Sequence, residues 1–192
     1  MHGKQQVASY IALGTVIALV ICVSVSFIAP IIISTILPSS YLNATEYAIG
    51  LIIAMTFKEL SELYNIGCFV GKTTKAQLSI NGIVAIIGLL GMFIFTQSYG
   101  VWGVIGSLIC AYFFRFTLFY FTSQHYFPLR FPLAKLLIFS AVTLFWLLLS
   151  SATSVYWLQI SLCIIAFTSL TATSYFLDLI PNQARLLRPD SQ

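Results

Sequence analysis

Residues 47–70 read YAIGLIIAMTFKELSELYNIGCFV, and the topology of the whole chain depends on whether this stretch crosses a membrane. Its first half is apolar, but Lys58, Glu59 and Glu62 follow near its middle. Each charge at the centre of a bilayer costs roughly 2.5–3.5 kcal/mol on the insertion scale. The stretch therefore inserts poorly by itself, and its charges need a physical reason.

The composition indicates an integral membrane protein. The chain has 192 residues, of which 59% are hydrophobic and only 7% are charged, and its mean hydropathy is +0.98. Soluble domains are usually about a quarter charged. Because backbone groups in lipid must be hydrogen-bonded within their own segment, the recurring apolar runs predict helices. The expected fold class is an all-α, polytopic membrane protein.

We expect six transmembrane helices, each near the roughly 20 residues that cross a hydrocarbon core of about 30 Å. Their approximate ranges are 7–37, 47–70, 78–96, 101–121, 133–150 and 155–177. These six spans form one transmembrane lobe over residues 1–182, and residues 183–192 form a cytoplasmic tail.

Basic residues in the connections predict the orientation. Seven of them lie at the N-terminus, after the second and fourth spans, and in the tail: Lys4, Lys72, Lys75, Arg130, Lys135, Arg185 and Arg188. The connections after the first, third and fifth spans contain no Lys or Arg. By the positive-inside rule, both termini are cytoplasmic. If residues 47–70 did not cross, four of these basic residues would move outside, so the bias favours a crossing.

Four charged residues at membrane depth are the candidate substrate or cavity residues: Lys58, Glu59, Glu62 and Arg115. Lys58 and Glu62 are four residues apart on one helix face and can pair, while Glu59 and Glu62 are also neighbours. One carboxylate is then left without a partner in its own helix, and Arg115 is the other ionised group at this depth. The four formal charges sum to zero.

Two interpretations of these charges stay open. In the first, they only neutralise one another between packed helices. In the second, they line a water-filled cavity, which the polar neighbours Thr56, Ser61 and Asn65 favour. Lys and Arg would then suit an anionic headgroup, because phosphate oxygens accept several hydrogen bonds. The carboxylates would suit coupling to protons or sodium.

Patterns typical of catalysis or metal binding are absent from the sequence. The four cysteines, Cys22, Cys68, Cys110 and Cys163, lie one to an apolar run, which favours packing roles. No nucleophile–base set or metal-ligand spacing is found. We expect no catalytic residue, metal or cofactor, and no nucleic acid partner, because the basic residues form no stripe.

Several motifs resemble a known family. A charged helix is followed by Gly71-Lys72-Thr73-Thr74-Lys75 and by a helix that contains Asn81. The turn Tyr99-Gly100-Val101-Trp102-Gly103 then leads into a helix that contains Arg115. This order is similar to the C-terminal six-helix lobe of polysaccharide (O-antigen type) flippases, in the multidrug/oligosaccharidyl-lipid/polysaccharide exporter superfamily. The likeness is clearest over residues 47–132.

The resemblance implies two six-helix lobes around a central cavity, alternating access, and a lipid-pyrophosphate-linked oligosaccharide as the substrate. It implies no catalytic residue. Six spans make only one lobe, so we expect a second six-helix lobe as a partner, either a missing N-terminal half or another subunit, with a homodimer as a further form. Membrane lipids are the other expected partners.

The leading hypothesis is a membrane transporter, or half of one, that flips lipid-linked oligosaccharide or polysaccharide repeat units across the bacterial inner membrane. One alternative is an ion-coupled multidrug exporter of the same superfamily, with Glu59 and Glu62 as its coupling site. Another is a non-transporting accessory subunit of polysaccharide synthesis. An enzyme is not expected, because the outer connections are short and Glu46 is their only acidic residue.

Overall fold

The structure is a computed structural model that describes residues 2–38, 44–71, 73–129, 131–153, 156–177 and 179. All regular structure within these ranges is helical, which confirms the all-α prediction. The helices are α1 (His2–Ile36), α2 (Ala44–Tyr64), α3 (Ile66–Val70), α4 (Thr74–Tyr99), α5 (Val101–Tyr126), α6 (Leu133–Ala152) and α7 (Tyr156–Phe176). The predicted tail at 183–192 and the basic residues Lys72, Arg130, Arg185 and Arg188 lie outside the described residues.

Five of the described helices are long and apolar enough to cross a membrane, namely α1, α4, α5, α6 and α7. Helix α2 has 21 residues, a sufficient length, but it contains the charged stretch that starts at Lys58. The structure is therefore compatible with a membrane protein of several spans. The crossing of α2, and with it the sixth span, stays a prediction from the distribution of basic residues.

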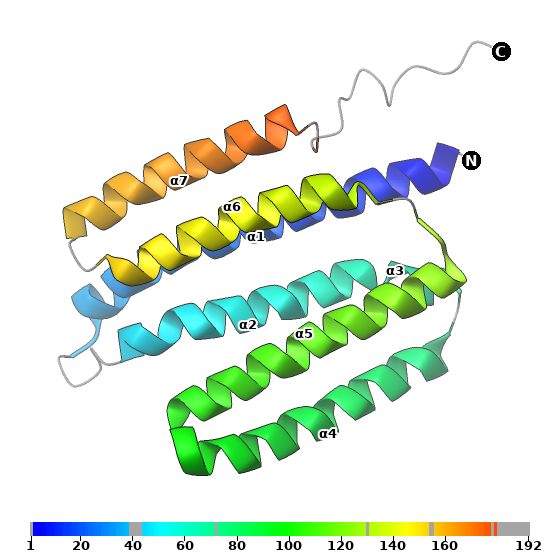
Figure 1. Ribbon diagram of the computed structural model, residues 1–192, viewed down its shortest axis with the longest axis horizontal. Coiled ribbons are helices and arrows are strands. Elements are labelled where there is room, and N and C mark those ends of the chain that lie inside the picture. The colour runs from blue at the N-terminus through cyan, green and yellow to red at the C-terminus, as the bar shows by residue number, and fades with distance from the viewer. Residues whose placement is uncertain are drawn as a thin grey trace.

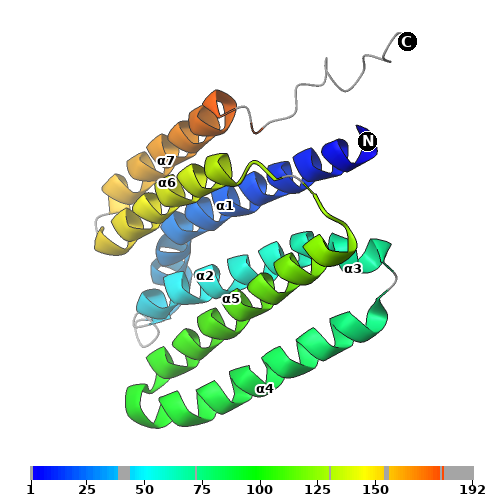
Figure 2. The same cartoon turned by 45° about the vertical axis from the view of Figure 1, so that its right-hand side comes forward.

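Helix α2 joins two groups of helices. It packs against α1, which contacts α6 and α7, and against α5, which contacts α3 and α4. Successive long helices run in opposite directions, so the start of α1 and the short helix α3 lie at one end of the bundle (Figure 1). The α4–α5 and α6–α7 turns lie at the other end. Turning the molecule shows α6 and α7 on the side of α1 away from α4 (Figure 2).

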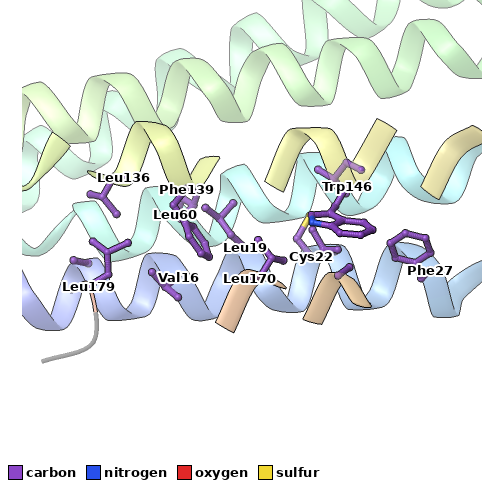
Figure 3. Close-up of a cluster of buried hydrophobic side chains, with 14 residues drawn as sticks. Val16, Leu19, Cys22, Phe27, Leu60, Leu136, Phe139, Trp146, Leu170 and Leu179 are labelled. Atoms are coloured by element: carbon purple, nitrogen blue, oxygen red, sulfur yellow. The ribbon is translucent and has the colours of Figure 1, made fainter. Parts of the chain in front are cut away.

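Helix α1 is the centre of the main hydrophobic core. Val23 and Phe27 are each only 1% exposed, and they belong to a cluster to which α2, α6 and α7 also contribute buried side chains. Figure 3 shows Phe139 of α6 and Leu170 of α7 among the side chains gathered on α1. Trp146 of α6 meets Phe27 edge-on, with ring centroids 6.5 Å apart. The 35 residues of α1 span about 52 Å at about 1.5 Å each, so α1 runs the full height of the bundle.

The outer helices expose large apolar side chains. In α4, Leu89 and Phe93 are 68% and 71% exposed, and in α7, Phe176 is 88% exposed. A soluble monomer rarely exposes apolar patches of this extent. Such faces are compatible with contact to lipid, where an exposed apolar side chain carries no hydrophobic cost.

The range 47–70, expected as one span, forms two helices that are separated at Asn65. The amide of Gly67 donates a hydrogen bond of 2.9 Å to Ser123 Oγ of α5, and not to the carbonyl four residues before it. A Cβ at Gly67 would overlap the hydroxyl and backbone of Ser123. Close packing of α3 on α5 therefore takes the Gly67 amide out of the helical ladder, and α2 ends at Tyr64.

Candidate functional site

Arg115 connects three helices at the centre of the charged cluster. It lies in the middle of α5, and its side chain is 12% exposed. Its Nε donates to Asn81 Oδ1 of α4 at 3.0 Å. Its Nη1 and Nη2 donate to Ser61 Oγ at 2.7 Å and Glu62 Oε1 at 2.6 Å, both on α2. The planar guanidinium group therefore joins α2 and α4 to α5 through three different acceptors.

Aromatic side chains surround this connection. The guanidinium carbon of Arg115 lies 5.1 Å from the ring centroid of Phe119, which is fully buried. On either side along α2 and α5, Phe57 meets Phe113 and Tyr64 meets Phe116, with centroids 5.4 and 5.1 Å apart. Edge-to-face pairs of this kind are favourable. They pack α2 against α5 on both sides of Arg115, whose side chain is 12% exposed, whereas its partner Glu62 is 45% exposed.

The ion pairs differ from those expected from helical spacing. Helical spacing allows Lys58 to pair with Glu62, but Lys58 Nζ lies 3.3 Å from Glu59 Oε1 and Glu62 pairs with Arg115. The reason is that α5 brings a guanidinium group within reach of Glu62, and two further acceptors hold it there. Lys58 and Glu59 are more open, at 41% and 61% exposed. Each carboxylate therefore has a cationic partner.

A groove of about 740 Å³ lies between α1 and α2, beside the charged cluster. Its walls are mainly apolar and include Ile17 and Ile21 of α1 and Met55 of α2. Glu59 and Glu62 also line it, whereas Lys58 and Arg115 do not. A smaller cavity of about 430 Å³ shares Glu62 and continues toward α3. The groove therefore presents carboxylates, and not cations, to whatever occupies it.

The polar neighbours have distinct positions. Ser61 is fully buried and accepts a hydrogen bond from Arg115. Thr56 lines the groove, and its hydroxyl donates to Ile52 O of its own helix. Asn65 lies at the break after α2, where its Oδ1 accepts a hydrogen bond of 3.2 Å from Gln77 Nε2 of α4. Of the three, only Ser61 contacts the charged cluster and only Thr56 faces the groove.

Asn81 is the partner of Arg115 that sequence reasoning did not place in the site. In the sequence, Asn81 belongs only to the motifs that carry the family resemblance. The available signal was an amide side chain inside an apolar run, because a polar group at membrane depth must find a partner on another helix. Spacing along α4 gives no information about which partner that is.

Metal binding has no visible basis in the part of the chain that the structure describes. Within it, no group of three or more His, Cys, Asp or Glu side chains lies close enough to hold a metal ion. The four cysteines are free thiols, with Cys22 and Cys68 buried and Cys110 exposed. Cys22 also lines the groove between α1 and α2.

Comparisons with protein-family models, with curated proteins and with solved structures find no match for this chain. The sequence motifs described above and the geometry of the groove are therefore what support a function.

Proposed function

We propose that this chain is one lobe of a membrane transporter that flips lipid-linked oligosaccharides across the bacterial inner membrane, and that the α1–α2 groove is its part of the translocation path. The observation that carries the proposal is a groove of about 740 Å³ with apolar walls and two carboxylates, Glu59 and Glu62, in the last two turns of α2. Charge at membrane depth is costly, so charged groups beside a groove mark a path for a ligand or an ion.

The groove suits the parts of such a substrate differently. Its apolar walls match the hydrocarbon chain of a lipid carrier. Lys58 does not line the groove; it is 41% exposed beside Glu59, and its ammonium group keeps further donors for a pyrophosphate group outside the apolar walls. Arg115 has three nitrogen atoms already bonded to protein acceptors. Its proposed role is therefore to hold α2 in place beside the groove, and not to bind the substrate.

A second candidate function is ion-coupled export of lipophilic cations. The observation that favours it is that Glu59 and Glu62 line the groove while Lys58 and Arg115 do not. Carboxylates in a mostly apolar cavity would attract a cation with a large apolar body. The two candidate functions share the groove and differ in the charge of the transported group.

Both candidates require a second lobe. The groove is open on the side away from the other helices, and its lining residues Ile21 and Met55 are 55% and 48% exposed. A translocation path needs walls on both sides, so we expect another six-helix lobe to face α1 and α2. Because a path exists only where both lobes are present, the tests belong in cells that contain the natural partner.

The test is complementation in bacterial cells from which the gene for this chain has been deleted. Ile21→Trp narrows the groove, and Ile86→Trp is the matched control, because Ile86 is 60% exposed on α4 and lines none of the described cavities near α1 and α2. We expect the wild type and Ile86→Trp to restore surface polysaccharide, and Ile21→Trp to restore at least tenfold less at equal protein level.

Measuring resistance to lipophilic cations in the same cells separates the two candidates. Restored resistance without restored polysaccharide, abolished by Glu59→Gln, would favour the exporter. Equal polysaccharide from Ile21→Trp and Ile86→Trp would show that the groove is not the path.

A further inference from the structure

A third cavity, of about 500 Å³, lies at the end of the bundle away from α3. It forms where α1 and α6 end and where α2, α5 and α7 begin. In Figure 1 this is the end that holds the α4–α5 and α6–α7 turns. The predicted topology places this end on the outer side of the membrane. We call this cavity the end pocket.

Glu46 and Trp102 define the chemistry of the end pocket. Glu46, in the first turn of α2, is exposed and forms no ion pair or side-chain hydrogen bond with another described residue. Trp102, in the first turn of α5, is 49% exposed. Its ring is held edge-on by Tyr47, with centroids 5.3 Å apart at an interplanar angle of 65°. The pocket therefore has an available carboxylate beside a fixed, half-open indole ring.

Other polar groups add hydrogen-bond acceptors. Ser151 Oγ donates to Leu148 O at 2.8 Å, and Gln159 Nε2 donates to Thr153 O at 2.7 Å. The Ser151 hydroxyl and one N–H of Gln159 are thus engaged as donors, while the side-chain oxygen atoms of both residues can still accept. No Lys or Arg is among the lining residues. The pocket therefore favours a ligand that donates hydrogen bonds, and an anionic ligand would meet Glu46 with no Lys or Arg to offset it.

From this combination we propose that the end pocket binds a neutral saccharide. Sugar rings present C–H groups on their faces, which pack on an aromatic ring, and hydroxyl groups at their edges, which donate to carboxylate and amide oxygens. The identification of that saccharide with the glycan of a transported lipid rests on the proposed function. The chemistry of the pocket does not, because it follows from its own side chains.

The proposal is tested by saturation-transfer NMR on the full chain in phosphatidylglycerol nanodiscs. The probe is a neutral oligosaccharide obtained by partial acid hydrolysis of the surface polysaccharide of the source cells. Glu46→Gln keeps the size of an exposed side chain and should weaken binding about fivefold, because a charge-assisted hydrogen bond becomes neutral. Trp102→Leu removes the stacking ring and should weaken binding about 3–10-fold.

Trp157→Leu is the matched control. Trp157 belongs to α7 near the same end of the bundle, is 82% exposed, and does not line the end pocket. Its replacement should leave binding unchanged. Absence of saturable binding to the wild type, or equal binding by Glu46→Gln, Trp102→Leu and the wild type, would overturn the proposal. So would saturable binding of phosphocholine in place of the saccharide, which would make the pocket a lipid headgroup site.

The saccharide-binding experiment and the complementation test can fail separately. If saccharide binding is lost in Glu46→Gln and Trp102→Leu but the wild type restores no surface polysaccharide, the end pocket stands and the proposed function fails. If the wild type restores polysaccharide but binds no saccharide, the proposed function stands and the end pocket fails.

Discussion

Replacing Arg115 by Ala is expected to loosen the packing of α2 and α4 on α5. The change removes the hydrogen bonds to Asn81, Ser61 and Glu62 from an interface in which the Arg115 side chain is 12% exposed. Hydrogen bonds between membrane helices contribute about 0.6 kcal/mol each on average, so the loss of three predicts a fall in unfolding free energy of about 2 kcal/mol. Glu62 is then left without its cationic partner, and this unpaired charge adds to the loss.

Arg115→Lys should be less damaging than Arg115→Ala. It keeps the positive charge, but one ammonium group cannot serve acceptors on both α2 and α4 in the way a planar guanidinium group does. We expect a loss of about 1 kcal/mol, roughly half the effect of alanine at about 0.6 kcal/mol for each hydrogen bond.

A second substitution in the Arg115→Ala variant shows which carboxylate, Glu59 or Glu62, is the partner of Arg115. Glu62→Gln removes the charge that has lost its partner, so it should recover part of the stability. Glu59→Gln should recover none, because Glu59 is paired with Lys58 and not with Arg115. Spacing in the sequence alone allows either carboxylate to be the partner, and the ion pairs in the structure choose Glu62.

The assay is reversible unfolding of purified protein in mixed micelles with increasing dodecyl sulfate, followed by tryptophan fluorescence in a Trp102→Phe, Trp157→Phe background that leaves Trp146 in the core as the reporter. The reasoning is wrong if Arg115→Ala unfolds within about 0.5 kcal/mol of the wild type, a difference smaller than one average interhelical hydrogen bond. It is also wrong if Glu59→Gln rescues as well as Glu62→Gln. Normal stability together with lost surface polysaccharide would instead assign Arg115 to substrate binding.

Two further predictions concern the packing and the topology. Gly67→Ala places a methyl group against Ser123 and should lower the unfolding free energy by about 1–3 kcal/mol. Gly82→Ala should leave it unchanged, because a Cβ at Gly82 meets nothing within 4 Å. Equal unfolding of the two variants in dodecyl sulfate would contradict this prediction. In a variant without native cysteines, a membrane-impermeant thiol reagent added outside should label a cysteine at Ser151 and miss one at Thr74; labelling at Thr74 would overturn the predicted orientation.

The positions of α1, α4, α5, α6 and α7 could be predicted from the sequence because each of these helices is a long apolar run, which is a local feature. Apolar runs long enough to cross a membrane must form helices, since lipid offers no partner for backbone groups. The sequence also indicated the turn between α4 and α5 through Gly100. In the structure Gly100 adopts φ +56°, a conformation that favours glycine. The four charged residues stood out for the same local reason, as rare charges within apolar runs.

Partners between helices were decided only by the tertiary structure. Helical spacing shows which residues share a face of one helix, and so it suggested Lys58 with Glu62. It contains no information on a guanidinium group 53 residues away, nor on an Asn81 amide on a third helix. The break at Asn65 has the same origin, because the acceptor for the Gly67 amide is Ser123, 56 residues further along the chain. Which charges face the groove follows from how α1, α2 and α5 pack, since packing buries Arg115 in the α2–α5 interface and leaves Glu59 and Glu62 beside α1.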